Sequence, residues 1–218
     1  LPKHVERCVA EDWNVFAASS PEIALDSDIH FVKDCSFGEN ISLKTQTKPF
    51  RYAQSLSKTK GNDRFLNVVN EHRLIPFSSH SYLITADNKA VFGIKRNLSG
   101  QISAFAGYPK GSEVFVKDGK KCLDVYGSLL RALEKEVRGV NEKIKEVKHV
   151  GFTFKNQISP RVLDANYVVF LNQNFDEFQK EFVPDFQFNR ELIGIYFTFE
   201  SLRDFALEHL ELFSRHCL

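Results

Sequence analysis

The 218-residue sequence contains no Met and a single Trp, although it has 21 Phe. Its four Cys lie far apart and form no Cys-x-x-Cys pair, at Cys8, Cys35, Cys122 and Cys217. This spacing supports neither a zinc site nor a disulfide framework, so we expect free thiols. The sequence also lacks an apolar run of about 20 residues and the apolar core of a signal peptide. We therefore expect a soluble, cytoplasmic protein with no membrane partner.

The charge balance and several missing motifs exclude further classes of protein. A net charge of +1 provides no whole-molecule field to attract DNA or RNA, so we expect no nucleic-acid partner and only local recognition of anions. The chain has no HExxH, GxSxG, P-loop or GxGxxG motif, so zinc-protease, serine-hydrolase, NTPase and dinucleotide-fold interpretations lack their usual starting point. With 43% hydrophobic and 26% charged residues, the composition is typical of a folded globular protein.

The order of apolar patterns predicts an α+β fold. Residues 1–70 show short apolar alternations broken by Ser, Asp, Gly and Pro, which predict a β-rich extension with a few strands rather than helices. The remaining 71–218 segment is predicted to be the main domain. It opens with an antiparallel hairpin turning at Asp87-Asn88-Lys89, and strands grouped around single helices follow. This order favours a mixed sheet sandwiched between helices over a regular βαβ repeat.

One predicted helix has an acidic residue on its apolar face. The helix is expected between Asp124 as N-cap and Gly139 as stop, and four apolar residues form its stripe, namely Val125, Leu129, Leu133 and Val137. Glu136 falls inside that stripe. A carboxylate in a core costs free energy unless a partner such as a divalent cation pairs with it. The alternative is that the helix ends before Glu136 and the side chain reaches water.

A second carboxylate is expected close to this helix. Gly107 and Glu113 are separated by five residues and directly follow a predicted strand, so Glu113 would lie on a loop facing the helix. Two carboxylates from a loop and a helix suit Mg²⁺, which takes a few hard oxygen ligands and keeps several waters and substrate phosphate oxygens.

These residues resemble the signature of the Nudix hydrolase family. That signature runs Gly, five residues, Glu, seven residues, Arg-Glu, an aliphatic residue, any residue, Glu-Glu, any residue, Gly and an aliphatic residue. The matching positions here are Gly107, Glu113, Arg131, Leu133, Glu136, Gly139 and Val140. The hairpin before the signature and the late strand and helix, 192–205, are also similar to the order of elements in Nudix domains.

The sequence departs from the signature in several places. Seventeen residues, instead of seven, separate Glu113 from Arg131, which predicts a loop insertion around "VFVKDGKKCL". Ala132 and Lys135 replace two of the signature glutamates, and one extra residue precedes the closing Gly. A second register, with Lys135-Glu136-Val137 on Arg-Glu-aliphatic, loses both paired glutamates. The metal site is depleted in either register.

The resemblance implies a Nudix-like α/β/α sandwich and a pyrophosphohydrolase that acts on a nucleoside diphosphate derivative with Mg²⁺ or Mn²⁺. The metal ligands would be Glu113 and Glu136, and Glu136, Arg131 and Glu134 would be the catalytic residues. Substrate-binding positions would be Arg96, Lys95 and Gly107. A general base would come from a later loop, with Glu181 and Asp185 as candidates.

A second interpretation is a Nudix-fold module without catalytic activity that binds a nucleotide or a protein partner. Ala132 and Lys135 favour it, because a cation in place of a ligand repels a metal ion. A third interpretation, a purely structural or interaction role built on residues 1–70, has no residue-level support. A homodimer is compatible with each interpretation, and the fold does not decide among them.

Overall fold

A computed structural model describes residues 2–19, 26–36, 42–58, 75–95, 100–154, 162–182 and 189–213. The chain divides into two compact units made of interleaved segments. The first unit comprises Leu1–Ser78, Tyr108–Val125 and Phe152–Asp164, and the second comprises Ser79–Gly107, Tyr126–Gly151 and Ala165–Leu218. The predicted domain boundary at residue 70 lies outside the described residues.

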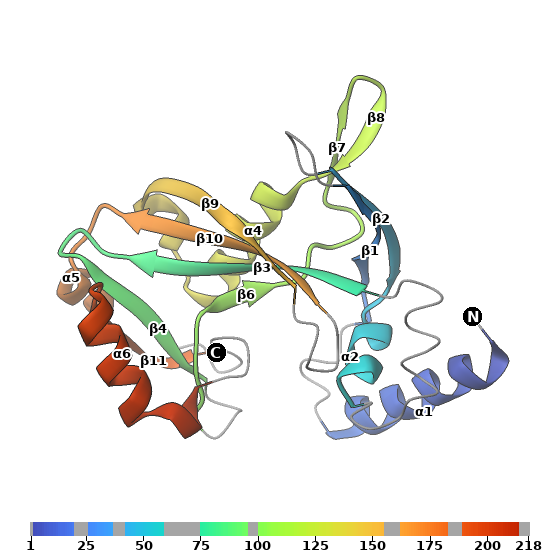
Figure 1. Cartoon of the computed structure of the whole chain (residues 1–218), viewed down its shortest axis with the longest axis horizontal. Coiled ribbons are helices and arrows are strands. Elements are labelled where there is room, and N and C mark those ends of the chain that lie inside the picture. The colour runs from blue at the N-terminus through green and yellow to red at the C-terminus, as the bar shows by residue number, and fades with distance from the viewer. Residues whose placement is uncertain are drawn as a thin grey trace. The chain divides into compact units, whose positions relative to one another are not determined.

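The first unit contains helices as well as strands (Figure 1). Its elements are α1 (Lys3–Ser19), β1 (Asp28–Ser36), β2 (Ser42–Pro49), α2 (Phe50–Lys58), the start of β3 (Ile75–Ile84), β7 (Val114–Lys117) and β8 (Lys120–Leu123). The expectation of strands rather than helices over residues 1–70 is therefore wrong for α1 and α2. Helix α1 buries only two residues, Val5 and Val9, which lie on one face at the i,i+4 spacing of a helix.

The core of the first unit joins both helices to β1. Val5 and Val9 of α1 pack with buried side chains of β1 and α2, which are Ile29, Phe31, Tyr52 and Ala53. The hydroxyl of Tyr52 donates a hydrogen bond to Glu6 at 2.8 Å, which also ties α2 to α1. Strand β1 pairs antiparallel with β2 and, through Phe31 and Val32, with the first residues of β3. Both helices thus pack against strand β1, and this tertiary contact adds to the stability of α1, which buries only two residues.

The second unit contains the rest of β3 and most of the remaining elements, although the end of β9 from Phe152 and the start of β10 up to Asp164 belong to the first unit. These are β4 (Lys89–Lys95), β5 (Ile102–Ser103), β6 (Phe105–Gly107), α4 (Val125–Glu136), η1 (Val140–Lys143), β9 (Ile144–Phe154), β10 (Leu163–Leu171), α5 (Phe175–Glu181), β11 (Asn189–Tyr196), α6 (Phe199–Glu208) and η2 (Leu210–Leu212). Strand β4 pairs antiparallel with β3, β5 and β11, and β6 pairs antiparallel with β3. Strand β10 pairs with β3 and β9. The predicted hairpin is confirmed as β3 and β4.

Alternating residues of this sheet face two different helical layers. Leu83, Val91 and Leu192 are buried in one cluster with Leu129 and Leu133 of α4 and with residues of α5. Their chain neighbours, among them Ile84, Phe92 and Ile193, belong to a second cluster that packs against α6 through Leu202, Phe205 and Ala206. Because side chains alternate between the faces of a strand, the sheet lies between α4 with α5 on one face and α6 on the other. The predicted α+β class with an α/β/α sandwich is confirmed in this unit.

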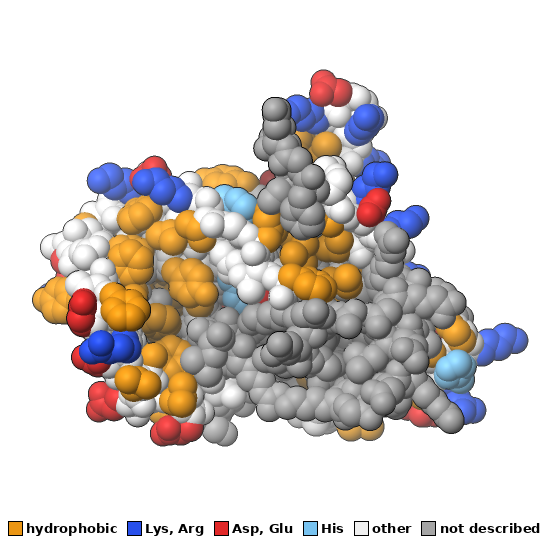
Figure 2. Space-filling view, viewed as in Figure 1, with side chains coloured by type: hydrophobic (Ala, Val, Ile, Leu, Met, Phe, Trp, Pro, Cys, Tyr) orange, Lys and Arg blue, Asp and Glu red, His pale blue; other side chains and the backbone are white. Residues whose placement is uncertain are grey.

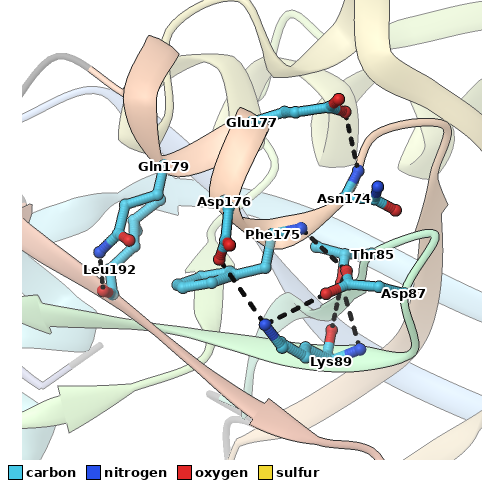
Figure 3. Close-up of polar contacts among 9 residues, drawn as sticks. All are labelled: Thr85, Asp87, Lys89, Asn174, Phe175, Asp176, Glu177, Gln179 and Leu192. Carbon is cyan, nitrogen blue, oxygen red and sulfur yellow. Dashed lines mark hydrogen bonds and ion pairs between the residues drawn. The ribbon is translucent and has the colours of Figure 1, made fainter.

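The turn of the β3–β4 hairpin is joined to the start of α5 (Figure 3). Asn88 adopts a positive φ of 59° at the turn. The Asp87 carboxylate accepts hydrogen bonds from the Thr85 hydroxyl at 2.7 Å and from the Phe175 N–H at 2.8 Å, and it lies 3.1 Å from the Lys89 ammonium. Asn174 and Glu177 add a capping box at the same helix start. The turn therefore holds the start of α5 against the hairpin.

In the part of the chain that the structure describes, Cys8, Cys35 and Cys122 are free thiols. No described helix has the length and apolar character needed to cross a membrane.

Candidate functional site

Glu136 lies in the apolar interior of the second unit, as the helical pattern predicts. Helix α4 continues to Glu136, and this residue is 6% exposed. The alternative of a helix that ends earlier is therefore wrong. The backbone N–H of Ala106, in the middle of β6, donates a hydrogen bond to Glu136 Oε1 at 3.3 Å. The ammonium group of Lys95, at the end of β4, pairs with Glu136 Oε2.

The Lys95–Glu136 pair is largely removed from water. Its side chains are 14% and 7% exposed, respectively. Removing one partner of such a pair typically costs about 3–5 kcal/mol, because the other charge stays buried without compensation. The buried carboxylate thus already binds a cation that the chain itself provides.

Helix α4 approaches strand β6 very closely at Gly107. A Cβ placed on Gly107 would lie 2.6 Å from the Cβ of Ala132, which is closer than real carbon contacts. Only the pair of a glycine on the strand and a small residue on the helix permits this packing. Ala132, which replaces a signature glutamate, is 6% exposed and therefore faces Gly107 rather than solvent.

Glu134 stabilises the end of the helix in this structure. Its carboxylate accepts hydrogen bonds from the Gly139 N–H at 2.7 Å and from the Asn141 N–H at 3.3 Å. Gly139 adopts a left-handed conformation with φ 79°, as expected for the predicted helix stop. Arg131 is half-buried and Lys135 is exposed. Among the helix residues, Glu136 is the buried carboxylate.

Glu113 belongs to the first unit, whereas Glu136 belongs to the second. The Glu113 carboxylate accepts the Lys110 N–H at 2.7 Å, so it turns back on its own loop. The same loop contacts β1, because the Gly111 N–H donates to the Asp28 carbonyl at 2.7 Å. The shared metal site of Glu113 and Glu136 remains a prediction.

His30 lies near Glu113, a proximity that the sequence does not indicate. It is 4% exposed, and its Nδ1 lies 3.0 Å from the Thr45 hydroxyl. Burial lowers the pKa of His30, and the backbone of Lys110 and the charge of Glu113 oppose that shift. Since His30 and Glu113 are 83 positions apart, no motif spacing could have connected them.

The predicted loop insertion is a β-hairpin. Strands β7 and β8 pair antiparallel and turn through Asp118 and Gly119, both at positive φ. The Asp124 N–H donates to the Glu113 carbonyl at 2.9 Å, which closes the base of the hairpin. Removing residues 114–123 would leave the seven residues 124–130 between Glu113 and Arg131, which is the spacing of the Nudix signature.

An open pocket lies in the first unit beside the loop of Glu113. Its volume is about 410 Å³, and acidic, hydroxyl and basic groups line it, from Asp26, Ser27, Asp28, Thr47, Lys110, Gly111 and Ser112. One oxygen of the Asp26 carboxylate accepts a hydrogen bond from the backbone N–H of Arg51 at 3.0 Å. The pocket has polar groups of both charges but no cluster that selects one ligand.

The candidate bases are only partly within the described residues. Glu181 pairs with the Lys143 ammonium at 2.8 Å and accepts a hydrogen bond from Gln173 at 2.9 Å. These two hydrogen bonds lower the pKa of Glu181, which makes it a poorer proton acceptor near neutral pH. Asp185 and the predicted phosphate ligand Arg96 lie outside the described residues.

Across the described ranges, no group of three or more His, Cys, Asp or Glu side chains is placed to hold a metal ion. A cation site at Glu136 therefore depends on one buried carboxylate in its own unit. Further ligands would have to come from the predicted Glu113, from solvent or from a bound phosphate.

Several solved structures are similar to this chain. The NUDIX domain of Shewanella oneidensis NrtR, solved with ADP ribose, is 12% identical, with a TM-score of 0.43 over 69% of this chain and 93% of that chain. A NUDIX-family hydrolase from Clostridium perfringens is 10% identical, with a TM-score of 0.36 over 63% and 87% of the two chains. Ap4A hydrolase from C. elegans is 12% identical, with a TM-score of 0.38 over 61% and 85%.

The similar structures thus include Nudix domains, the family whose signature this sequence resembles. At these identities and TM-scores, they assign no residue role and no substrate to this chain. No protein-family model matches the sequence, and no curated protein matches it.

Proposed function

We propose that this chain is a Nudix-type hydrolase that cleaves the pyrophosphate bond of a nucleoside diphosphate derivative with the help of Mg²⁺. The observation that carries the proposal is the buried, cation-bound carboxylate of Glu136 on helix α4. A buried carboxylate on an otherwise apolar helix face costs stability, and function is a common reason for keeping one.

The spacing around the signature supports the same proposal. With the β7–β8 hairpin as an insertion, Glu113 and Arg131 have the signature spacing, and the base of the hairpin is closed by one backbone hydrogen bond. The close packing of Gly107 on Ala132 gives the first signature position a physical role.

Glu136 supplies one buried carboxylate for a cation, and in this structure Lys95 neutralises it. Glu136 would hold the ion, and Glu113 would contribute if the two approach each other in the complex. When bound, Mg²⁺ would neutralise diphosphate charge and orient a water molecule. The Ala106 N–H orients the Glu136 carboxylate, and Lys95 would bind phosphate as a point charge.

The proposal is tested with a panel of nucleoside diphosphate derivatives, incubated with Mg²⁺ or Mn²⁺ and assayed for phosphate-bond cleavage. We expect turnover by the wild-type protein and a loss of at least about 100-fold in Glu136→Gln, because the substitution removes the charge that holds the cation. Glu142→Gln, at an exposed position after the helix, is the matched control and should keep full activity. Turnover of Glu136→Gln at the wild-type rate would refute the proposal.

A second candidate is a Nudix-fold module that binds a nucleotide or a protein partner without cleavage. The specific observation in its favour is the ammonium of Lys95 at the carboxylate where a metal ion would bind. Ala132 and Lys135, in place of signature glutamates, also favour it. In this case calorimetry would detect nucleotide binding while the panel above shows no product with either metal ion.

A further inference from the structure

We propose that the β7–β8 hairpin is a docking surface for a protein partner, and that an extended, acidic segment of that partner adds to the hairpin as a third strand beside β7. This docking is additional to the proposed cleavage, since none of residues 114–123 is assigned to the substrate or the metal ion. The open backbone edge of the hairpin and the arrangement of its charges select this occupant.

The hairpin has open edges on both sides. Strands β7 and β8 form a sheet of two strands, and among the described elements no third strand pairs with either of them (Figure 1). In an antiparallel pair, alternate residues point their backbone N–H and C=O groups away from the partner strand, so the outer edge of β7 presents donors and acceptors to an incoming strand. A two-stranded hairpin is only marginally stable in water, and a third strand stabilises it.

Apolar side chains lie beside the β7 edge and are exposed to solvent. Val114, Phe115 and Val116 of β7 are 38%, 47% and 69% exposed. Strand β8 is less open, because Cys122 and Leu123 are half-buried. The edge beside β7 therefore offers an incoming strand more apolar surface to bury.

The charge of the hairpin selects the kind of strand that fits. Its turn end carries Lys117, Lys120 and Lys121 against one acidic residue, Asp118. The three lysines are exposed and form no ion pair with another described residue. Lysines at a strand edge disfavour a strand that lacks acidic residues, whereas opposite charges on neighbouring strands attract. A strand with acidic residues at the turn end and apolar residues at the base therefore fits this edge.

The same pattern disfavours nucleic acid and membranes as partners. Three lysines neutralise few phosphates, and a net charge of +1 adds no wider attractive field, so a nucleic acid would gain little affinity. A membrane-bound element buries its apolar side chains in the lipid, but Val114 and Phe115 lie nearer the base of the hairpin than the lysines of the turn.

The test is a titration of the isotope-labelled full chain with the peptide Glu-Glu-Glu-Val-Tyr-Val, followed by amide shifts in two-dimensional NMR. In an antiparallel strand beside β7, the acidic end of this peptide meets the turn. We expect shifts concentrated at residues 114–123 and a Kd below about 1 mM. The peptide Lys-Lys-Lys-Val-Tyr-Val should bind at least about tenfold more weakly, because the exposed ion pairs are lost. N-methylation of Val and Tyr in the Glu peptide should weaken binding similarly, because the peptide then cannot donate to the strand edge.

Variants of the full chain test whether the hairpin is the surface that binds. Lys117→Glu/Lys121→Glu should invert the preference, so that the Lys peptide binds more tightly than the Glu peptide. Lys145→Glu/Lys180→Glu, at exposed positions elsewhere, changes the net charge equally and should bind like the wild type. The chain with residues 115–122 replaced by Asn-Gly should bind neither peptide.

Absence of shifts at millimolar Glu peptide, or equal affinity for the Glu and Lys peptides, would overturn the proposal. Binding that persists in the shortened chain would do the same. Tighter binding of the wild type to phosphatidylserine vesicles would assign the hairpin to a membrane instead, and tighter binding to a duplex oligonucleotide would assign it to nucleic acid. A wild-type dimer that dissociates in the shortened chain would make a second copy the occupant, and it would equally refute the acidic partner.

Discussion

Asp87 shows how one residue can join elements that are distant in the sequence. Burial alone would raise the pKa of its carboxyl group, but hydrogen bonds from Thr85, Phe175 and Lys89 lower it to about 2. The same donors hold the hairpin turn against α5 (Figure 3). The folded state therefore favours the ionised form of Asp87 more strongly than the unfolded state does.

This difference predicts a pH-dependent contribution to stability. Because the folded pKa lies below the unfolded value, the contribution is present above about pH 4 and is lost as the pH falls toward 2. Asp87→Asn should lower the urea midpoint at pH 7 and flatten the stability profile between pH 4 and pH 2. Asp118→Asn, in the exposed hairpin turn, is the control, because Asn tolerates its positive φ. An unchanged profile in Asp87→Asn would contradict the assigned role.

At the scale of elements, the end of α4 depends on a side chain that the signature had suggested as catalytic. Glu134 accepts two backbone N–H groups beyond the helix end, from Gly139 and Asn141. Glu136, two residues further, points inward instead. The helical repeat of 100° per residue separates these two directions, so neighbouring acidic residues have different surroundings.

Glu134→Ala is therefore expected to reduce stability rather than chemistry. Each lost hydrogen bond is worth about 1 kcal/mol, so the free energy of unfolding should fall by about 1–3 kcal/mol. The rate of cleavage, measured below the melting temperature on the same substrate panel, should stay within about threefold of the wild type. Glu142→Ala controls for the loss of a negative charge in the same region. A large loss of turnover with unchanged stability would instead make Glu134 catalytic.

The β7–β8 hairpin is the element that separates this chain from the signature spacing. Figure 2 shows basic side chains on it, and its residues Lys117, Lys120 and Lys121 are exposed. Val114 and Leu123 pair at its base, next to the hydrogen bond from Asp124 to Glu113. The residues that enter and leave the hairpin are thus held together at its base.

Shortening the hairpin should therefore leave the fold intact. Replacing residues 115–122 with Asn-Gly keeps the pair at the base and provides a two-residue turn. Because the removed side chains are mostly exposed, the free energy of unfolding should change by less than about 1 kcal/mol, as measured by urea denaturation followed by circular dichroism. Loss of cooperative unfolding would show that the hairpin is needed for the core. A random sequence of equal length in its place is a further control.

At the scale of the whole molecule, each unit has its own core but neither is a continuous stretch of chain. Val9 is buried in the first unit and Leu133 in the second. Strand β3, Ile75–Ile84, is continuous across the division between Ser78 and Ser79. A strand that belongs to both units should couple their unfolding.

We expect a single cooperative transition for the whole chain. Trp13, the only Trp, lies in α1 and reports on the first unit by fluorescence, whereas far-ultraviolet circular dichroism reports on all elements. Leu133→Ala, in the second unit, should cost about 2–5 kcal/mol and shift both signals to the same lower midpoint. Val9→Ala should shift both by a smaller amount. A Trp13 signal that does not respond to Leu133→Ala would show that the units unfold independently.

Local pattern predicts the elements with the strongest periodicity. The β3–β4 hairpin, helix α4 and its stop at Gly139 follow from alternation, a 3.6-residue stripe and a glycine, and each is a short-range feature. The helices α1 and α2 were not predicted; α1 buries only Val5 and Val9, and packing of both helices on β1 supplies stabilising contacts. Of the candidate site, the position of Glu136 in the apolar stripe follows from the sequence, but its burial remained one of two alternatives, and its partner could not be predicted because Lys95 is 41 positions away.

The sequence by itself predicted an α+β protein with a glutamate in the apolar stripe of the helix of a depleted Nudix-like signature, because periodicity depends only on neighbouring residues; that this glutamate is buried was decided by the structure. Only the tertiary structure decided which cation pairs with that glutamate, that Ala132 faces Gly107, and that Glu134 ends the helix. These contacts join residues whose distance in space does not follow from their distance along the chain. The physical reason is that burial and charge pairing are properties of the packed core, which forms only when several elements meet.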